Sequence, residues 1–584
     1  MAGDRLRGRS TGQPPELLSA DGVHSVTFDG RHPTLVGVYP EHSDSITQRD
    51  QFLDMVRQRE EERGCMHFLT SSCRAPISRL PAELLAEVFL YVKGNNAHWS
   101  GWHRILSICR HWFVVGAAMP RLWNHICVRR SVDHLRVSLA RSKTIPVEID
   151  LKPTGMSRTG NLAFAEVISI IMPHVHRLRV LRLGTISVAD VPNALAFLRS
   201  RSFPVLRALT AYPESQSHTL ELEPQRFPSL RELCFERLNV FSSIAVMSQL
   251  TTLRFNAFNG LDDAFTMDSL LTAISSMANL EDLVLSHVYF RNTVIYPSAC
   301  SKVGFSRLRS VEMTMDAAVT KRILSYMIIP PSSRVYLALS LVHATSPQTF
   351  QDILPSDKSS LPILSELTVI RISATWAMVA FRGSISPDDL NASPTLAYRF
   401  QVIVDVPDYE FEEADPELDD ALEVLEYTPQ VHTLYIQTSV SMSTGAAWLH
   451  ALSGLPKLQR LTVVLTFDAY QRTEGTTVNT ILSTLSSPPV DPLAHDGVIC
   501  PILKRLRLVG SWKWTVYMTE RVVEYLEARR QLLGRQIALQ ELSIALHGRL
   551  PSEDFQELKK GFEEAASPFV GRVVFESKAS PLEE

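Results

Sequence analysis

The stretch "RLRVLRL", from Arg177 to Leu183, carries the pattern that decides the fold. Leu178, Leu181 and Leu183 form the phrase L-x-x-L-x-L, whose last two positions alternate as the residues of a strand do. This alternation sends two apolar side chains into a core and leaves the residue between them facing outward. A single copy would mean little, but the phrase recurs along the chain.

Five further copies follow closely, namely "FPVLRALTA", "FPSLRELCF", "QLTTLRF", "NLEDLVL" and "RLRSVEM". Later copies are "LPILSELTV", "QVHTLYI", "LPKLQRLTV", "CPILKRLRL" and "LQELSI", with weaker ones at "SRVYLAL" and "YRFQVIV". The early copies are about 20–30 residues apart, the period of leucine-rich repeats. Helical patterns such as "VPNALAFLRS" and "TERVVEYLEARRQLL" fall between many copies. The sequence therefore predicts an irregular α/β leucine-rich-repeat-like solenoid over residues 128–577.

Composition narrows the class of protein. The chain has 584 residues, of which 45% are hydrophobic, enough for a sizeable core. Its 58 basic and 62 acidic residues leave a net charge of −4, which gives no reason to expect nucleic acid as the main partner. The seven scattered cysteines do not form a disulfide framework. With no secretory signal and no apolar run of about 18 residues, we expect no membrane association and a cytoplasmic or nuclear location.

Three segments are predicted to lie outside the regular array. Residues 1–42 are predicted to be a disordered arm, and residues 43–64 an amphipathic helix. An acidic insertion near residues 405–427 favours an exposed loop that enters a helix, and the alternative is a patch for a basic partner. Residues 578–584 are predicted to be a tail.

Motifs that carry catalysis are missing from the sequence. It has no phosphate-binding glycine loop, no H-E-x-x-H helix and no G-x-S-x-G elbow. Cys65, His67 and Cys73 are spaced too loosely for a tetrahedral zinc site. We therefore expect no catalytic residue, no metal ligand and no cofactor, and we do not expect an enzyme.

A short segment before the array has a different character. In "ISRLPAELLAEVFLYV", Ile77 to Val92, a helix is predicted to begin at Pro81 and to end near Lys93. Its apolar positions are Leu84, Leu85, Val88, Phe89 and Val92. They cover a wider arc than the roughly 100° stripe of an ordinary surface helix. Either this helix is buried all round, or one apolar face awaits another protein.

A second helix is predicted in the same segment, over "WHRILSICRHWFVVGAA" from Trp102 to Ala118, followed by the turn "MPRLWNHICV". Its broad apolar stripe holds Ile105, Leu106, Cys109, Trp112, Phe113 and Gly116. About fifty residues bury only a small core. The surplus of large apolar side chains indicates a partner.

These phrases resemble an F-box, in the form found in large fungal F-box families. The family's Leu-Pro-x-Glu-Leu-Leu is present at residues 80–85, its Cys-Arg-x-Trp at 109–112 and its Pro-x-Leu-Trp at 120–123. Lys93 stands where the family usually has a small or apolar residue. The resemblance implies an F-box-like domain over residues 75–127. The fold class expected is α+β overall, with a small all-α three-helix module before the irregular α/β solenoid.

The resemblance also implies a function. F-box helices dock on the Skp-type adaptor of a cullin–RING ubiquitin ligase, and the rest of the chain recruits the protein substrate. Carried over by position, the adaptor-binding residues are Leu80, Pro81, Leu84, Leu85, Val88, Phe89, Cys109, Trp112 and Trp123. The implied role is the substrate-recognition subunit of an SCF-type ligase. The alternative is a leucine-rich-repeat scaffold without a ligase, and a more distant one is an enzyme with a site in the acidic middle.

Candidate substrate contacts are the residues expected to face outward from the strands. They are Arg182, Glu232, Arg254, Asp282, Glu366, Tyr435, Arg460, Arg505 and Arg507. Trp512 and Trp514 are further candidates, as an exposed aromatic anchor or as a cap over the last repeats.

Overall fold

The structure is a computed structural model that describes most of the chain beyond Arg79. The described residues are 80–95, 102–128, 132–151, 164–214, 219–242, 244–256, 259–260, 266–290, 302–339, 349–375, 378–386, 398–405, 418–438, 445–466, 474–487, 498–510, 516–534, 538–547 and 552–578. The predicted arm and the helix at 43–64 lie outside them, as do residues 406–417 of the acidic insertion, Trp512, Trp514 and residues 579–584. The chain from Leu80 onward forms one compact unit.

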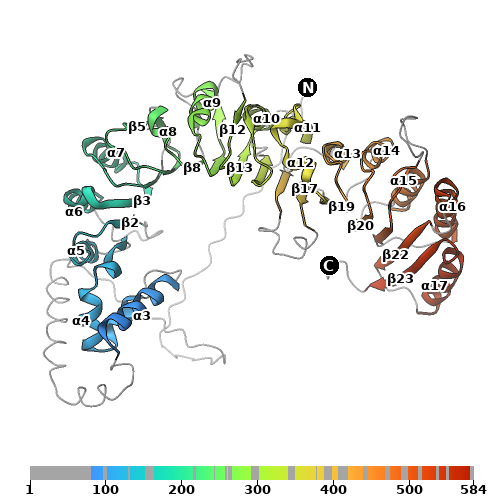
Figure 1. The fold of residues 1–584 in the computed structure, drawn as a ribbon, viewed down its shortest axis with the longest axis horizontal. Coiled ribbons are helices and arrows are strands. Elements are labelled where there is room, and N and C mark those ends of the chain that lie inside the picture. The colour runs from blue at the N-terminus through green and yellow to red at the C-terminus, as the bar shows by residue number, and fades with distance from the viewer. Residues whose placement is uncertain are drawn as a thin grey trace, which may run out of the picture. The chain divides into compact units, whose positions relative to one another are not determined.

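Among the described residues, seventeen strands form one continuous sheet (Figure 1). In spatial order the strands are β1 (His125–Val128), β2 (Val147–Leu151), β3 (Leu178–Ile186), β4 (Ala208–Pro213), β6 (Glu232–Glu236), β8 (Thr252–Asn256), β10 (Asp282–Ser286), β13 (Ser310–Met315), β15 (Arg334–Leu339), β18 (Phe400–Asp405), β17 (Met378–Ser384), β16 (Val369–Ala374), β19 (Thr433–Thr438), β20 (Arg460–Leu465), β21 (Arg505–Gly510), β22 (Leu539–His547) and β23 (Val570–Lys578). Small parallel pairs accompany them: β5 (Thr219–Leu222) with β7 (Asn239–Ser242), β9 (Asn259–Gly260) with β11 (Tyr289–Phe290), and β12 (Val303–Gly304) with β14 (Met327–Ile328).

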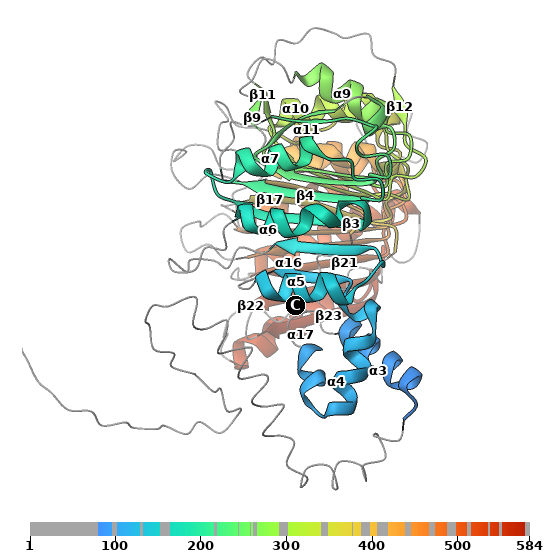
Figure 2. The same cartoon turned by 90° about the vertical axis from the view of Figure 1, so that its left-hand side faces the viewer.

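Helices cover one side of this sheet, and Figure 2 shows three of them, α5, α6 and α7, stacked beside their strands. The α-helices of the array are α5 (Val132–Arg141), α6 (Phe164–Ile171), α7 (Val191–Ser200), α8 (Ile244–Met247), α9 (Met267–Ser276), α10 (Ala317–Tyr326), α11 (Phe350–Ile353), α12 (Ile363–Glu366), α13 (Leu418–Glu423), α14 (Gly445–Ser453), α15 (Glu474–Ser486), α16 (Val516–Leu533) and α17 (Ser552–Ala566). Short 3₁₀ turns lie between them, η4 (Met172–Arg177), η6 (Lys358–Ser360) and η8 (Val424–Tyr427).

Most of the L-x-x-L-x-L phrases form strands, as predicted. In β3 the side chains of Leu181 and Leu183 are buried. The residues paired with Leu181 on the two adjacent strands, Ile149 and Leu209, are buried as well. These side chains belong to one hydrophobic core that lies between strands and helices. The predicted solenoid is therefore confirmed, because each strand–helix unit buries its apolar residues against its neighbours.

Local capping explains where several helices begin. The Thr266 side chain accepts a hydrogen bond from the backbone N–H of Ser269 at the start of α9. The Asp316 carboxylate does the same for Ala318 and Val319 at the start of α10. Each side chain satisfies backbone donors that the first helical turn leaves without an intrahelical partner.

The middle of the array departs from simple repetition. The strands β16, β17 and β18 follow β15 in the chain, yet in space β18 pairs with β15 and β16 pairs with β19, both in parallel. The strand β17 lies between β16 and β18 and is antiparallel to both. An antiparallel three-stranded unit is thus inserted without interrupting the sheet.

One predicted register in this region is wrong. In "LPILSELTV" the pattern predicts the phrase on Leu364, Leu367 and Val369, but Ile370 and Ile372 are the residues that pair with Leu434 and Ile436. The phrase is therefore displaced by three residues. The reason is that Leu364, Leu367 and Ile370 are all apolar, so the pattern fits two registers.

The same displacement corrects one site prediction. Glu366 was expected to face outward from a strand. It is instead the last residue of the short helix α12, where it is exposed. The outward position of this strand belongs to Arg371.

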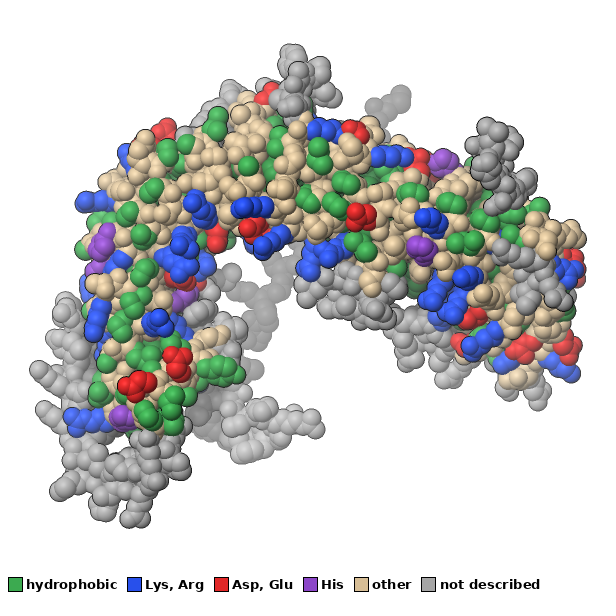
Figure 3. Space-filling view, in the orientation of Figure 1, with side chains coloured by type: hydrophobic (Ala, Val, Ile, Leu, Met, Phe, Trp, Pro, Cys, Tyr) green, Lys and Arg blue, Asp and Glu red, His purple; other side chains and the backbone are tan. Residues whose placement is uncertain are grey.

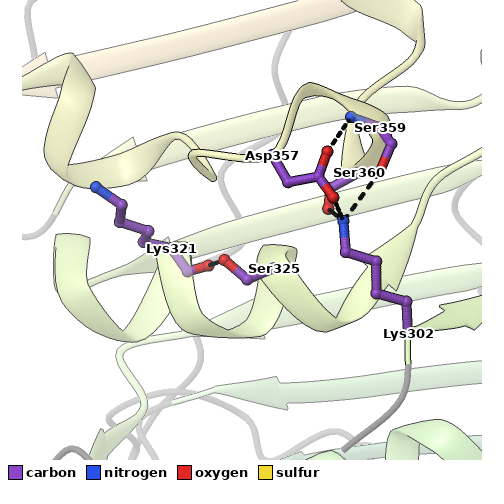
Figure 4. A network of polar contacts seen from close by, with 6 residues as sticks. All are labelled: Lys302, Lys321, Ser325, Asp357, Ser359 and Ser360. Carbon is purple, nitrogen blue, oxygen red and sulfur yellow. Dashed lines mark hydrogen bonds and ion pairs between the residues drawn. The ribbon is translucent and has the colours of Figure 1, made fainter. Parts of the chain in front are cut away.

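Charged side chains stabilise several turns of the array through hydrogen bonds and ion pairs. Figure 4 shows Lys302 donating to the hydroxyls of Ser359 and Ser360, at 3.0 and 2.8 Å, and pairing with Asp357. The second carboxylate oxygen of Asp357 accepts the backbone N–H of Ser359 at 2.9 Å. The hydrogen bond from Lys302 lowers the pKa of Asp357 to about 2, so this carboxylate is ionised over the physiological range. Elsewhere, the buried Arg177 donates to the carbonyl oxygen of Leu139 at the end of α5, at 2.8 Å.

Candidate functional site

The segment that resembles an F-box folds as a small helical module. Its elements are α3 (Ala82–Asn95), η2 (Trp102–Ser107), α4 (Arg110–Ala118) and η3 (Pro120–Trp123). Their own core consists of Leu85, Phe89, Trp102, Leu106, Trp112, Leu122 and Trp123. Gly116 permits this packing, because a Cβ there would lie 2.2 Å from Leu106 Cδ2. The fifty-residue segment thus closes a core of its own.

The second helix of the module is shorter than predicted. The structure breaks "WHRILSICRHWFVVGAA" into a 3₁₀ turn, η2, and the helix α4. Cys109 has extended backbone at the break, and its Sγ accepts the backbone N–H of Trp112 at 3.5 Å. Cys109 therefore serves as the N-cap of α4, a role that apolar periodicity does not reveal.

Large apolar side chains remain exposed on this module. On α3, Leu84 is 54% exposed, Val88 38% and Tyr91 71%. Their spacing of four and three residues places them on one helix stripe, beside the buried stripe of Leu85 and Phe89. Ile108, Phe113 and Val114 are exposed on and next to α4. Among the described residues, six of the fourteen exposed large apolar side chains thus belong to this small module, where Figure 3 shows hydrophobic side chains gathered.

Lys93, the residue that departs from the family pattern, is buried where α3 meets η3. Its Nζ donates to the carbonyl oxygens of Arg121 and Leu122, both at 3.1 Å, and to Asn124 Oδ1 at 2.9 Å. Burial lowers the pKa of Lys93 to about 8, and the charge of Glu148 partly opposes this shift. The lysine ties the end of α3 to η3, whose last carbonyl groups have no helical partner.

The module also contacts the first repeat. The Nε2 atoms of His103 in η2 and His134 in α5 lie 2.9 Å apart. The guanidinium of Arg141, at the end of α5, lies over the Trp123 ring, 4.5 Å from its centre. The strand β1, which follows η3, pairs with β2 of the array. These contacts leave the exposed stripe of α3 uncovered.

The residues predicted to bind the adaptor divide into two groups. Pro81, Leu84 and Val88 are exposed, and Leu80 is half-buried. The side chains of Leu85, Phe89, Trp112 and Trp123 lie in the module core, and Cys109 caps α4. The first group is thus accessible at the surface of the module, whereas the second holds its helices together. Tyr91 and Val114 are exposed neighbours that the family pattern does not single out.

A second candidate surface is the side of the sheet that faces away from the helices. Eight of the predicted substrate contacts lie there, exposed or half-buried: Arg182, Glu232, Arg254, Asp282, Tyr435, Arg460, Arg505 and Arg507. The strand register puts Tyr435 and Arg507 at the same level of the sheet, with Thr462 between them. Arg182 and Arg254 occupy that level several strands away, so they are not brought together with Tyr435.

Two residues that the sequence analysis did not predict, Arg371 and Arg382, lie beside Tyr435 at this level of the sheet. Arg371 on β16 pairs with Tyr435 on one side and with Arg382 of β17 on the other. The Arg371 guanidinium lies 4.6 Å from the centre of the Tyr435 ring, and its Nη2 donates to Gln437 Oε1 at 3.0 Å. Burial lowers the pKa of Arg382, a shift that Tyr398 opposes and that Arg371 increases. Burial raises the pKa of Tyr435, against the opposing charges of Arg371 and Arg507.

The correct register of β16 would have identified Arg371 from sequence. Arg382 lies on the antiparallel strand β17, which carries no repeat phrase, and no signal in the sequence marked it.

The described part of the chain offers neither a metal site nor a membrane span. No group of three or more His, Cys, Asp or Glu residues there is arranged to hold a metal ion. No described helix is both long and apolar enough to cross a membrane.

Comparison with known proteins provides only distant likenesses. No protein-family model and no curated protein matches the sequence. An internalin from Listeria monocytogenes is 9% identical, with a TM-score of 0.22, over 71% of this chain and 94% of its own. The structure of TLR13 in a complex with ssRNA13 is 13% identical, with a TM-score of 0.23, over 68% of this chain and 52% of that one. Both likenesses are too distant to indicate a function, and the repeat architecture follows from the strand register alone.

Proposed function

We propose that this chain is the substrate-recognition subunit of an SCF-type cullin–RING ubiquitin ligase. The module around α3 docks on a Skp-type adaptor, and the solenoid binds the protein to be ubiquitylated. The chain itself carries out no chemistry. It holds two proteins together and so raises the effective concentration of the substrate near the transfer site.

One observation carries the proposal, and it is the division of α3 into two apolar stripes. Leu85 and Phe89 are fully buried in the module core, while Leu84 and Val88 on the adjacent stripe remain exposed. The core is therefore complete without the exposed residues. Clusters of exposed apolar side chains on soluble proteins mark interaction sites more often than scattered ones do.

A repeat scaffold without a ligase is the second candidate. The contacts His103–His134 and Trp123–Arg141 favour it, because they show that the module packs on the first repeat. Such packing is sufficient to hold the module in place. It does not account for the exposed stripe of Leu84 and Val88.

Adaptor binding separates the two candidates. We expect the full chain to co-purify with a Skp-type adaptor, and the substitutions Leu84→Asp and Val88→Asp to reduce that binding at least about tenfold, because each places a charge into the apolar contact. Both positions are exposed, so the module should still fold. Val188→Asp and Leu532→Asp, at exposed apolar positions of the array, are the matched controls and should bind normally.

Two results would contradict the ligase proposal. The first is a correctly folded chain that fails to bind the adaptor. The second is a Leu84→Asp, Val88→Asp protein that binds as tightly as the unmodified chain. Either result favours the scaffold.

Substitutions in the module core have a different expected result. Leu85→Ala or Phe89→Ala should destabilise the module by about 2–5 kcal/mol, because each leaves a cavity among large side chains. Faster hydrogen exchange in residues 82–95 of the free chain would show this effect. Unchanged exchange would mean that these side chains do not support the module. Loss of adaptor binding in these variants therefore reports folding and not docking.

A further inference from the structure

The strands β16, β17, β19, β20 and β21 share an unusual charge pattern. They are contiguous in the sheet and hold five arginines, with no Asp, Glu or Lys: Arg371, Arg382, Arg460, Arg505 and Arg507. The four strands β6, β8, β10 and β13 hold four acidic residues and one arginine. A chain with a net charge of −4 thus concentrates positive charge on one part of its sheet. Figure 3 shows Lys and Arg side chains along this strand side.

At the centre of these strands lies a group that we call the arginine patch: Arg371, Arg382 and Arg507, with Tyr435 among them. The register places all four at one level of the sheet. All four side chains are half-buried. Arg460 and Arg505 lie one level away, and Arg505 has an ion-pair partner in Glu541 at 3.5 Å.

The two central arginines, Arg371 and Arg382, contact neutral side chains in the part of the chain that the structure describes. Among the described residues, neither Arg371 nor Arg382 forms an ion pair with a carboxylate, and the buried Nε of Arg371 has no hydrogen-bond partner. Both guanidinium groups lie near tyrosine rings, which hold their planes without neutralising their charge. Planar guanidinium groups bind carboxylate or phosphate oxygens through two parallel hydrogen bonds.

From this arrangement we infer that the arginine patch binds an anionic segment of a protein, with carboxylate or phosphate side chains seated on Arg371, Arg382 and Arg507. The inference rests on the proposed function in one respect, that the segment belongs to the substrate that the solenoid recruits. The charge pattern, and the lack of an ion pair with a carboxylate at Arg371 and Arg382 among the described residues, are independent of the ligase.

The register also predicts the spacing of the two anionic groups. Arg371 and Arg507 are three strands apart, which is about 14 Å at about 4.8 Å per strand. An extended peptide that crosses the strands advances about 3.4 Å per residue, so about four residues span this distance. One anion would lie on Arg371 and Arg382, and the second, four residues away, on Arg507.

Binding of labelled peptides to the full chain tests this inference by fluorescence anisotropy. The probes are three twelve-residue peptides of Gly, Ser and Ala that differ only at positions i and i+4, with two phosphoserines, two glutamates or two serines. We expect an anionic peptide to bind, more weakly at 0.5 M salt, and the serine peptide not to bind. Binding of the phosphoserine peptide alone identifies phosphate as the ligand chemistry, and binding of both anionic peptides shows that carboxylates suffice.

Substitutions locate the site. Arg371→Ala and Arg507→Ala should each weaken binding about 10- to 100-fold, the usual effect of losing charge-assisted hydrogen bonds. Arg371→Lys keeps the charge but loses the planar pair of donors, and it should recover binding only in part. The matched control is Arg521→Ala, on helix α16 and outside the patch, which should bind normally.

Several outcomes would overturn the inference. These are equal binding of the serine peptide, no binding of any anionic peptide, or equal losses from Arg521→Ala and Arg371→Ala. An RNA oligonucleotide that binds more tightly than the peptides would point to nucleic acid instead of protein. Failure here remains distinct from failure of the ligase proposal, because the Arg371→Ala, Arg507→Ala chain should still bind the adaptor, and the Leu84→Asp, Val88→Asp chain should still bind the peptide.

Discussion

Individual buried Lys and Arg side chains connect neighbouring elements of this fold. Lys93, Arg177 and Arg529 are all buried, and each donates to backbone carbonyl oxygens at the end of a helix or turn. A buried carbonyl group with too few hydrogen bonds is costly away from water, and these side chains supply additional donors. Burial removes water from each charged group, and its hydrogen bonds to the carbonyl oxygens offset the free energy lost in this way.

For Lys93, the free energy of desolvation can be measured from the way stability changes with pH. Its pKa in the folded chain is lowered to about 8 from an ordinary value of 10.5. Between these values the unfolded chain retains the proton while the folded chain releases it, so the free energy of unfolding should rise with pH. We expect the unmodified chain to gain stability relative to Lys93→Met from pH 8 to 10.5, on the order of 3 kcal/mol at most. Urea midpoints of both proteins measure the difference, and a constant difference over this range would contradict the shift.

Arg529 provides a test at the other end of the array. Its guanidinium donates to the carbonyl oxygens of Ile499 and Cys500, at 3.1 and 2.7 Å. Arg529→Met removes both hydrogen bonds inside the core and should destabilise the chain by about 2–4 kcal/mol. Arg521→Met on the same helix breaks only a surface pair with Glu524 and should cost less than about 0.5 kcal/mol. Thermal unfolding of both variants is the measurement, and equal losses would show that the carbonyl contacts of Arg529 contribute nothing.

At the scale of elements, the joint between the module and the array depends on two histidines. His103 in η2 and His134 in α5 share one contact between ring nitrogens, which requires at least one neutral ring. Burial lowers the pKa of His134 below 6.5. Trp102 stacks on His103 with ring centres 4.0 Å apart, the Trp123 ring lies 5.8 Å from His103, and the Ser138 hydroxyl lies 3.5 Å from His134 Nε2.

Acid should therefore loosen this joint. Below pH 6.5 the unfolded chain binds a proton at His134 that the folded chain resists, so stability is lost as the pH falls toward the lowered pKa. We expect the unmodified chain to lose more stability than His134→Gln between pH 7.5 and 5.5, measured by urea midpoints. An equal loss in both proteins would assign the acid sensitivity to other groups.

Sequence patterns predicted the presence of helices and strands better than their register and their ends. Helix α7 coincides with the predicted "VPNALAFLRS", because the apolar spacing there admits one register. The register predicted for β16 is three residues too early, because apolar residues recur at every third position before this strand. The break at Cys109 was missed because a capping thiol looks like one more apolar residue of a helix.

The candidate sites follow the same logic. The apolar surplus of α3 was visible in sequence, but its division into a buried and an exposed stripe required the packing of Trp112 and Leu122 to be known. The arginine patch depends on strands that are distant in the chain and adjacent in space. Arg371 and Arg382 meet only because β17 runs antiparallel to β16.

At the scale of the whole molecule, the chain carries two surfaces of opposite character. The module presents apolar side chains on α3 and α4, and the strands β16, β17, β20 and β21 present arginines. The two surfaces share no residues. If each binds its own partner, a change in one should leave the binding at the other unaltered, as a receptor that connects two proteins requires.

Hydrogen exchange of the full chain, with and without a purified Skp-type adaptor, tests the central claim most directly. The adaptor should slow exchange in α3 and α4, residues 82–95 and 110–118, and leave the strands β16, β17, β19, β20 and β21 unaffected. The Leu84→Asp, Val88→Asp chain should show no such protection. Protection absent from α3, or located on the strands instead, would contradict the claim that the exposed stripe of this helix is a docking surface.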